Sequence, residues 1–386
     1  MRSAPIRQWL RRLFRLDESD PAESHLERGK ALCARGDHAQ GVEAYQRAID
    51  ADPDDAEAHY RTGIAWRDQE QFASAVASYH RALAIKPDYI EAHNNLGVVF
   101  QLQNDLPAAQ SCYRRAVELN PDFSQPYINL GRLCEMMGTR AEAAQCYRQA
   151  IAANVEPETF RHFLDAAEGV MTGRAPAAYA RTVFDNFAEQ FDHRLVADLG
   201  YRIPQILGER VLELCASRQL RVLDLGCGTG LCAQHLKPSA SSMIGVDVSP
   251  AMLAKAGTLK LYDELIEQDI TDYLTAAAPA SFDLVLAADV FVYIGDLAQV
   301  FNETARVLDN EGLFAFSVER TEEARDFMLQ PNGRYVQSAA YIQRIAAESG
   351  FAELVSFEET IRGAPGHGAP GLVFILRKKP QKSSTL

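Results

Sequence analysis

The stretch "RVLDLGCGTG", Arg221 to Gly230, leads from a short apolar run into three glycines at alternate positions. A glycine-rich turn directly after a strand is typical of a site for a nucleotide-like ligand. The phosphate-binding loop needs a lysine directly after its last glycine, and no lysine follows Gly230. The dinucleotide-binding turn would place its third glycine at position 231, which is Leu231. The pattern therefore excludes the first kind of loop and disfavours the second.

An acid and the three glycines of this turn suit a different cofactor. S-adenosylmethionine has no phosphate, but its amino-acid part carries both charges. Gly226, Gly228 and Gly230 would let the backbone approach that part closely. Asp224, at the end of the same strand, can help to orient the ammonium group. The turn therefore favours S-adenosylmethionine over NAD.

Two further acids follow at the expected ends of the next two strands. Asp247 stands 17 residues after Gly230, and Asp269 precedes Ile270. Doubly wound sheets bind their ligands at the carboxyl ends of their strands. Asp247 is predicted to accept both ribose hydroxyls, and Asp269 to accept the adenine amino group. The alternative, an ordinary turn with surface acids, is disfavoured because all three features occur in the right order.

The second half of the chain alternates short apolar runs with helical segments. The runs are "RVLDLGCG", "SSMIGVDVS", "LYDELIEQDI", "FDLVLAADV" and "GLFAFSVER". This alternation predicts βαβ units and an α/β doubly wound, mostly parallel sheet. The last two runs, "AELVSFEETIRG" and "GLVFILRKK", are separated by only "APGHGAP". They are expected to pair as an antiparallel C-terminal hairpin.

These motifs resemble those of class I S-adenosylmethionine-dependent methyltransferases, from about residue 181 to residue 379. "DLGCGTG" corresponds to the family's glycine turn, "GVDVSPAML" to its ribose segment and "EQDI" to its adenine segment. The resemblance places Met252 beside the adenine. The predicted cofactor-binding residues are Asp224, Gly226, Cys227, Gly228, Gly230, Asp247, Val248, Met252, Asp269, Ile270 and Asp289.

The predicted catalytic residues lie in "AADVFVY", after the fourth strand. This fold brings substrate and methyl donor together there, so Asp289 is predicted to orient or deprotonate the acceptor. Tyr293 is predicted to be a second pocket residue. The alternatives are a turn or cap role for Asp289 and plain wall packing for Tyr293.

Four residues are predicted to contact the acceptor. Tyr201 and Arg202 end the segment 184–202, which is expected to fold over the cofactor as a lid. Arg334 and Tyr335 lie in "NGRYVQSAAY", after the fifth strand. The sequence does not identify the acceptor itself.

The first half of the chain repeats itself every 34 residues, as Pro53, Pro87 and Pro121 show. Three further sets keep the same spacing: Gly29, Gly63, Gly97 and Gly131; Tyr45, Tyr79, Tyr113 and Tyr147; Ala48, Ala82, Ala116 and Ala150. This period predicts an α-solenoid of stacked helix pairs. Small residues let the helices approach, the tyrosine fills the space between them, and the proline ends the second helix. The pattern resembles four tetratricopeptide repeats.

Such repeats commonly bind a protein or peptide in a concave groove, and a scaffold without a peptide ligand is the alternative. The glycine register places Tyr60, Asn94 and Ile128 along the groove. Asn95 and Asn129, one period apart, either bind a peptide backbone or are solvated side chains. The expected organisation is a basic amphipathic segment (1–20), four repeats (21–155), a capping helix and linker (156–180), a methyltransferase domain (181–380) and a tail (381–386).

The composition of the chain limits the kinds of partner and the cellular compartment that we expect. The net charge of −13 argues against a general nucleic-acid binder, which needs a basic face. Seven cysteines without C-x-x-C spacing disfavour a disulfide framework or a metal site and favour a reducing compartment, the cytoplasm. The sequence has no run of eighteen apolar residues that would predict a transmembrane helix. Residues 1–20 either pack on the following helices or touch an anionic membrane surface.

The sequence therefore predicts an S-adenosylmethionine-dependent methyltransferase of an unidentified acceptor, with repeats that recruit a protein or carrier-bound substrate. Two alternatives stay open. One is an O- or N-methyltransferase of a free small molecule whose repeats serve only assembly. The other is a cofactor-binding interaction protein without turnover.

Overall fold

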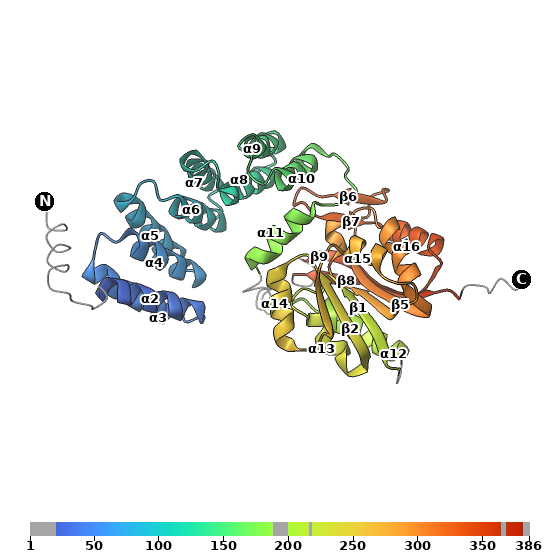
Figure 1. Cartoon of the computed structure of the whole chain (residues 1–386). Coiled ribbons are helices and arrows are strands. Elements are labelled where there is room, and N and C mark those ends of the chain that lie inside the picture. The colour runs from blue at the N-terminus through green and yellow to red at the C-terminus, as the bar shows by residue number, and fades with distance from the viewer. Residues whose placement is uncertain (1–20, 188–199, 216–217, 364–367, 381–386) are drawn as a thin grey trace, which may run out of the picture. The chain divides into compact units, whose positions relative to one another are not determined.

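The computed structural model describes residues 21–187, 200–215, 218–363 and 368–380 (Figure 1). The chain divides into two compact units, Met1–Glu156 and Pro157–Leu386. The amphipathic segment 1–20, residues 188–199 of the expected lid and the tail 381–386 lie outside the described residues. Their expected roles stay predictions. None of the described helices has the length and apolar character needed to cross a bilayer.

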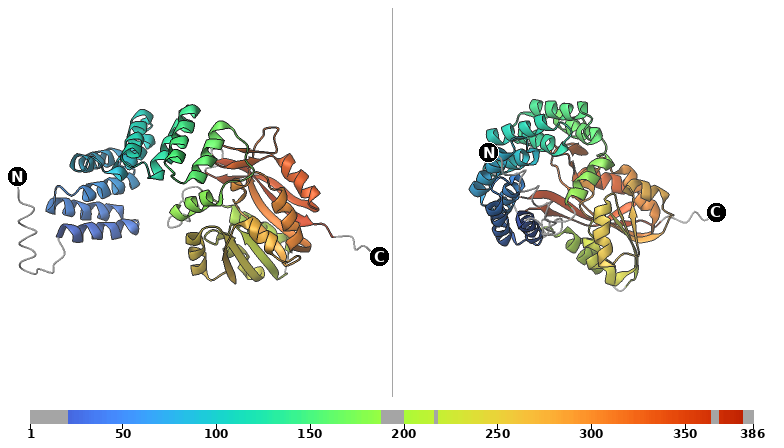
Figure 2. Two further views of the ribbon diagram at one scale, coloured as in Figure 1. Left: turned by 45° about the horizontal axis from the view of Figure 1, so that its top comes forward. Right: turned by 60° about the vertical axis from the view of Figure 1, so that its left-hand side comes forward.

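The described part of the first unit is a row of helices that stack in chain order (Figure 2). The helices are α2 (Pro21–Ala34), α3 (His38–Ala51), α4 (Ala56–Asp68), α5 (Phe72–Ile85), α6 (Ile90–Leu102), α7 (Leu106–Leu119), α8 (Ser124–Met136) and α9 (Arg140–Ala152). They form four successive pairs, which confirms the predicted solenoid. Helices α3, α5 and α7 each end two residues before a repeat proline, because the residue before a proline avoids the helical region.

The repeat glycines provide the space that the tyrosines fill. A Cβ atom built on Gly97 would lie only 2.6 Å from Tyr113 Cε1. The other three glycines meet their own tyrosines in the same way, and Tyr79, Tyr113 and Tyr147 are completely buried. The first helix of each repeat can therefore approach the second only where a side chain is absent.

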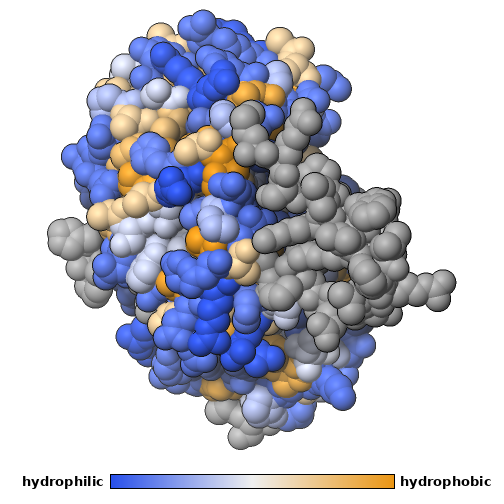
Figure 3. All heavy atoms as spheres, turned by 90° about the vertical axis from the view of Figure 1, so that its left-hand side faces the viewer, coloured by the Kyte–Doolittle hydropathy of each residue, from blue (hydrophilic) through white to orange (hydrophobic). Residues whose placement is uncertain are grey.

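The face shown in Figure 3 carries separate hydrophobic patches among hydrophilic residues. Two exposed apolar side chains of the repeat unit, Leu102 and Met136, stand one period apart and are 57% and 62% exposed. Gln101 Nε2 lies 3.3 Å from Met136 Sδ, so neighbouring repeats also touch at this position.

The second unit contains a seven-stranded sheet in the order β3-β2-β1-β4-β5-β9-β8. Its strands are β1 (Leu220–Leu225), β2 (Ala240–Asp247), β3 (Glu264–Glu267), β4 (Phe282–Ala287), β5 (Leu308–Glu319), β8 (Phe351–Arg362) and β9 (Ala369–Lys378). The first five are parallel, and β9 is antiparallel to both β5 and β8. This confirms the doubly wound sheet with a C-terminal hairpin. A separate two-stranded ribbon pairs β6 (Phe327–Leu329) with β7 (Tyr335–Gln337).

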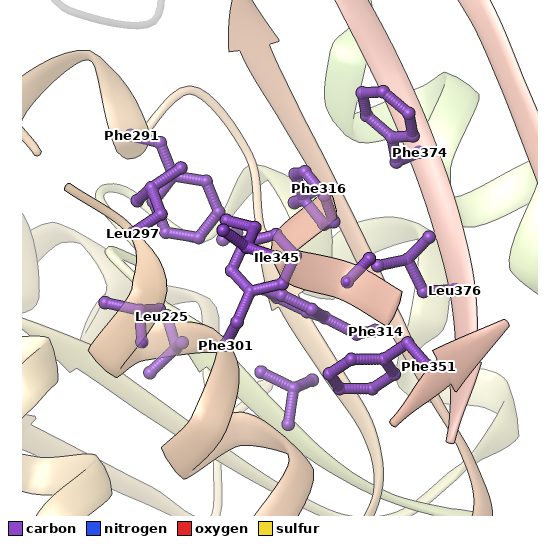
Figure 4. Close-up of a cluster of buried hydrophobic side chains, with 14 of the residues drawn as sticks. Leu225, Phe291, Leu297, Phe301, Phe314, Phe316, Ile345, Phe351, Phe374 and Leu376 are labelled. Carbon is purple, nitrogen blue, oxygen red and sulfur yellow. The ribbon is translucent and has the colours of Figure 1, made fainter. Parts of the chain in front are cut away.

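Helices cover both faces of the sheet (Figure 1). One face packs against α15 (Ile270–Ala276), α16 (Ala298–Val307) and α17 (Ala339–Glu348), and the other against α12 (Ile203–Cys215) and α13 (Leu231–Leu236). The first core gathers phenylalanines from β5, β8, β9 and α16 (Figure 4). Phe314 and Phe316 lie 4.6 Å apart between ring centroids, and Phe301 meets both edge-on.

The described residues of this unit also form α10 (Pro157–Glu168), α11 (Ala177–Phe187) and α14 (Pro250–Leu259). Helix α10 belongs to the second compact unit, although the sequence suggested a cap on the repeats. Its His162 Nε2 lies 2.8 Å from the Gly333 carbonyl oxygen, and its ring packs against Tyr179 and Tyr335. The capping role and the boundary at residue 181 stay predictions.

Candidate active site

A cavity of about 430 Å³ lies at the carboxyl ends of the parallel strands, where doubly wound sheets bind ligands. Its wall combines the turn after β1, the ends of β2 and β4, the start of α15, helix α11 and residues of the C-terminal region. The residues that line the cavity include Arg174, Ala180, Val183, Phe184, Tyr201, Gly226, Cys227, Gly228, Asp247, Val248, Asp269, Ile270, Asp289, Tyr293, Arg334 and Arg362.

The turn after β1 requires glycine for two reasons: its backbone is left-handed, and at Gly226 a side chain would have no room. Gly226, Gly228 and Gly230 have φ values of +62°, +54° and +91°, which other residues adopt only with strain. A Cβ atom on Gly226 would lie 2.5 Å from Val290 Cγ2, whereas one on Gly228 would meet nothing within 4 Å. Gly228 therefore exposes its backbone to the open cavity.

Asp247 ties this turn to the end of β2. Its Oδ2 accepts a hydrogen bond from the Gly228 amide and its Oδ1 accepts one from the Ser249 amide, both at 2.9 Å. Burial raises the pKa of the carboxyl, although the three backbone hydrogen bonds it accepts act against this shift. The carboxylate thus holds the turn in place and also lines the cavity.

The Asp269 side chain lines the cavity and also interacts with two parts of the protein. Its Oδ1 accepts from the Thr271 amide at 2.9 Å, so it caps the start of α15. Its Oδ2 forms an ion pair with Arg174. The backbone beside Arg174 is fixed as well, because the Gly295 amide donates to the Gly173 carbonyl oxygen at 2.9 Å. Arg174 is therefore held at the mouth of the cavity by the loop after β4.

Three of the predicted cofactor contacts lie behind the cavity wall. Asp224 is 1% exposed, and its Oδ2 accepts a 2.7 Å hydrogen bond from the Tyr262 hydroxyl, while burial raises its pKa to about 7. Met252 is fully buried in α14. A Cβ atom on Gly230 would lie 3.0 Å from Leu259 Cδ1, so this glycine faces the same helix. None of these three residues lines the cavity.

Asp289 lines the cavity in a strained left-handed conformation, with φ of +59°. Its amide donates to Ser317 Oγ at 3.0 Å. Its Oδ1 lies 3.3 Å from Arg362 Nη2 as an ion pair, but accepts no hydrogen bond from a described residue. Burial raises the pKa of this carboxyl, and Arg362 and Arg334 act in the opposite direction.

Tyr293 lies on the same wall, with its ring edge-on to Phe184 at 5.4 Å between centroids. Burial raises the pKa of its hydroxyl to about 12. The phenol therefore stays protonated at neutral pH and remains a hydrogen-bond donor.

The structure separates the four predicted acceptor contacts. Tyr201 and Arg334 line the cavity. Arg202 is exposed outside it. Tyr335 is completely buried, with its hydroxyl bonded to Thr172 and its ring against Phe327. In an extended chain, successive side chains point to opposite sides, so Arg334 and Tyr335 cannot share one pocket.

Sequence reasoning missed two arginines of this wall. Arg362 stands at the end of β8, whose pairing with β9 brings it beside Asp289. No sequence motif predicts that Arg362 lies in the site, because its position depends only on the register of the C-terminal hairpin. Arg174 lies before α11 in a stretch that reads as linker, and its partner Asp269 is distant in the sequence.

The expected groove residues of the repeat unit are largely occupied by neighbouring repeats. Tyr60 and Asn94 are 8% and 6% exposed. Asn95 Nδ2 donates to the Tyr60 hydroxyl and Asn129 Nδ2 donates to Asn94 Oδ1, both at 2.9 Å. Ile128 is half-buried. The two asparagines therefore join successive repeats, which neither alternative from the sequence anticipated.

Comparison with known proteins gives matches in both units. A methyltransferase domain model matches residues 223–316, and tetratricopeptide repeat models match residues 26–90, 90–123 and 124–154. A malonyl-[acyl-carrier protein] O-methyltransferase of Magnetococcus marinus is 26% identical over 37% of this chain and 54% of its own length. A ubiquinone biosynthesis O-methyltransferase of Bartonella tribocorum is 29% identical over 36% of this chain and 58% of its own length. The chain thus spans little more than half of these relatives.

Among solved structures, the second unit is similar to magnesium protoporphyrin IX methyltransferase from Synechocystis PCC 6803 with bound S-adenosylhomocysteine. The identity is 15%, the match covers 53% of this chain and 99% of that one, and the TM-score is 0.42.

The fold and the domain match define the second unit as a class I S-adenosylmethionine-dependent methyltransferase domain. The chain as a whole joins this domain to tetratricopeptide repeats. Its cofactor is S-adenosylmethionine, and the cavity fits this group. The open side of Gly228 leaves room for its amino-acid part, and Asp247 and Asp269 provide acceptors for its hydroxyl and amino groups.

Proposed function

We propose that this chain transfers a methyl group from S-adenosylmethionine to an acceptor bound beside Asp289 and Tyr293. One observation carries the proposal: a single cavity joins the glycine turn and its acids to an aspartate whose Oδ1 has no hydrogen-bond partner among the described residues. A buried polar atom without a partner is costly, and a catalytic or ligand-binding role is one reason why a protein retains it.

The cofactor would be held by the Gly226–Gly228 backbone, Asp247, Val248, Asp269 and Ile270. When bound, it supplies an electrophilic methyl group on a sulfonium. The residues of the chain then have two tasks, to position the nucleophile and to exclude water. Ala180, Val183 and Phe184 of α11 form an apolar wall that serves the second task.

Asp289 is proposed to accept a hydrogen bond, or a proton, from the acceptor through Oδ1. Its raised pKa makes the carboxylate a better base than an exposed aspartate. Tyr293, which stays protonated, is proposed to donate a hydrogen bond to the acceptor and to orient it.

The Asp289→Asn variant tests this role, since the amide keeps the shape and loses the basicity. If Asp289 is the base, turnover should fall by roughly 10²–10⁴-fold with cofactor affinity nearly unchanged. If it only orients the acceptor, the amide still forms a hydrogen bond and the loss should be smaller. Tyr293→Phe is the matched comparison for a group that only donates. Wild-type turnover of Asp289→Asn at saturating acceptor would remove Asp289 from the chemistry.

The cofactor site is tested by calorimetric titration of S-adenosylhomocysteine. Asp247→Ala should weaken binding, because it removes charge-assisted hydrogen bonds worth roughly 1.5–3 kcal/mol each and frees the Gly228 amide. Glu264→Gln, an exposed acid on the neighbouring strand, is the control and should bind normally. Unchanged affinity in folded Asp247→Ala would contradict the proposed site.

The repeat unit is proposed to recruit a protein or a carrier-bound acceptor. Tetratricopeptide repeats commonly mediate protein interactions, and one relative is named for a substrate on acyl-carrier protein. Free thiols at all seven cysteines support the cytoplasm as the compartment. The test compares the full chain with residues 157–386 on the natural acceptor, because α10 is built into the second unit. Equal activity of both would favour repeats that serve only assembly.

A further inference from the structure

Four charged side chains form a cluster at the acceptor end of the cavity: Asp289, Glu319, Arg334 and Arg362. Glu319 Oε1 pairs with both arginines, with Arg334 Nη1 at 3.2 Å and with Arg362 Nη2. The same Nη2 lies 3.3 Å from Asp289 Oδ1. Each arginine thus commits only one nitrogen to the acids of the cluster.

The guanidinium groups retain donors that no described residue uses. Arg362 has a side chain only 10% exposed, yet its Nε is buried without a hydrogen-bond partner. Among the described residues, the Arg334 side chain donates a hydrogen bond to Glu319 alone, and it is 30% exposed and lines the cavity. A guanidinium has five N–H donors in a planar fork that matches a carboxylate.

The charges that face the cavity favour an anion. Both arginines and Asp289 line it, whereas Glu319 is not among the lining residues and stands behind them. A cationic acceptor would meet two guanidinium groups beside the largely buried side chains of Arg362 and Asp289, where charge repulsion is weakly screened. A ligand carboxylate would instead meet the planar guanidinium groups of Arg334 and Arg362, which Glu319 holds in place.

Asp289 would balance the added charge. It is faced by Arg362, Arg334 and Glu319, and by the hydroxyls of Tyr201 and Tyr293. Burial already raises its pKa, and a ligand carboxylate nearby would raise it further, because like charges disfavour ionisation. Binding of a carboxylate is then expected to be accompanied by proton uptake at Asp289. Asp289 would then orient the acceptor and would not act as a base, because an ionised carboxylate has no proton to lose.

We infer that Arg334 and Arg362 bind a carboxylate group of the methyl acceptor, so that the acceptor belongs to the class of carboxylic acids. The inference rests on the proposed function, because it concerns the acceptor of that same cavity. It adds a specificity role for Arg362, which no sequence motif indicated.

The test uses the full chain saturated with S-adenosylhomocysteine and a matched pair of probes, butyrate and butyramide, whose binding is measured by ligand-observed NMR. Butyrate should bind at least about ten-fold more tightly than butyramide. Arg334→Gln and Arg362→Gln should each abolish that preference, while Arg202→Gln, an exposed arginine outside the cavity, should keep it. Equal binding of the two probes by the wild-type chain, or an unchanged preference in Arg334→Gln, would overturn the inference.

Two further measurements keep the test decisive. If Arg362→Gln does not fold because Glu319 loses its partner, Arg334→Gln alone decides, since its side chain is the more exposed of the two. Calorimetry of butyrate in two buffers of different ionisation enthalpy should show proton uptake, which Asp289→Asn should lose. A wild-type chain that does not bind S-adenosylhomocysteine refutes the proposed function, whereas one that binds it without preferring butyrate refutes only this inference.

Discussion

The repeat unit and the methyltransferase unit use glycine for opposite purposes. In the repeats, Gly97 has no side chain, so the Tyr113 ring fills the space beside it and packs directly against the backbone of the glycine. In the turn after β1, Gly228 has a left-handed backbone and a Cβ position that faces open space. The first kind of glycine is needed by the protein's own packing. The second kind leaves room that a ligand can occupy.

Buried polar side chains show the same contrast. Asn129 and Asn94 bind each other between successive repeats, so their polar atoms stabilise the stack. On the wall of the cavity, Asp289 Oδ1 and Arg362 Nε have no hydrogen-bond partner among the described residues. Unpaired buried atoms of this kind cost free energy in the folded chain. A ligand that forms hydrogen bonds with them can offset that cost.

The largest effect that separates the two kinds of glycine is expected for Gly228→Ala. The new methyl group enters the cavity, and the left-handed backbone costs about 1–2 kcal/mol. Affinity for S-adenosylhomocysteine, measured by calorimetry, should fall about ten-fold or more, which corresponds to about 1.4 kcal/mol. Gly257→Ala in α14, where the added Cβ would make an ordinary 3.7 Å contact, should bind normally. Unchanged binding by Gly228→Ala would place the cofactor elsewhere.

Gly97→Ala is the matching change in the repeats. The added Cβ would lie 2.6 Å from the Tyr113 ring, so the two helices must move apart, at a cost of about 1–3 kcal/mol. Hydrogen exchange of the α6 and α7 amides in the full chain should report this loss, while cofactor affinity stays unchanged. Glu91→Ala on the exposed side of α6 is the control. Normal protection of α6 in Gly97→Ala would mean that the tyrosine fits less tightly than its contacts indicate.

The asparagine pair tests whether neighbouring repeats are coupled. Asn129→Ala removes the donor to Asn94 Oδ1 and should weaken exchange protection of α8 by about 1 kcal/mol. A double-mutant cycle with Asn94→Ala should give a coupling energy of about 0.5–1.5 kcal/mol. Additive effects of the two substitutions would show that the bond does not contribute to stability.

The last expected effect concerns the pH dependence of stability in the repeat unit. Burial raises the pKa of Glu135 to about 7, and its Oε1 accepts from the Tyr147 hydroxyl at 3.2 Å. The folded chain therefore holds this proton more tightly than the unfolded chain does. The resulting stability is present below about pH 4.5 and is lost as pH rises through about 7.

Glu135→Gln should remove that pH dependence while it keeps the acceptor for Tyr147. Because the side chain is only half-buried, the difference between pH 5 and pH 8 should stay below about 2 kcal/mol. Exchange protection of α8 and α9 at the two pH values measures it. An equal pH dependence in wild type and variant would assign the decline to another group.

The features that could be predicted from the sequence are those that recur locally. The 34-residue period determined the helix pairs, because each repeat makes the same contacts as the next and so needs the same residues. The glycines after β1 and the acids at the ends of β2 and β3 determined the kind of cofactor. Each of them sits at a strand end, and all parallel strand ends meet at one edge of the sheet.

Only the tertiary structure determined which side chains face the cavity. Arg362 reaches Asp289 because the antiparallel pairing of β8 with β9 brings the end of β8 to the cavity. Asp224 and Met252 lie behind the wall because the strand and helix that carry them turn these side chains into the core. The orientation of a side chain depends on strand register and helix packing, and these are settled by contacts between residues far apart in the chain. A local pattern can therefore name the edge of the sheet where a ligand binds, but not which neighbouring side chains face it.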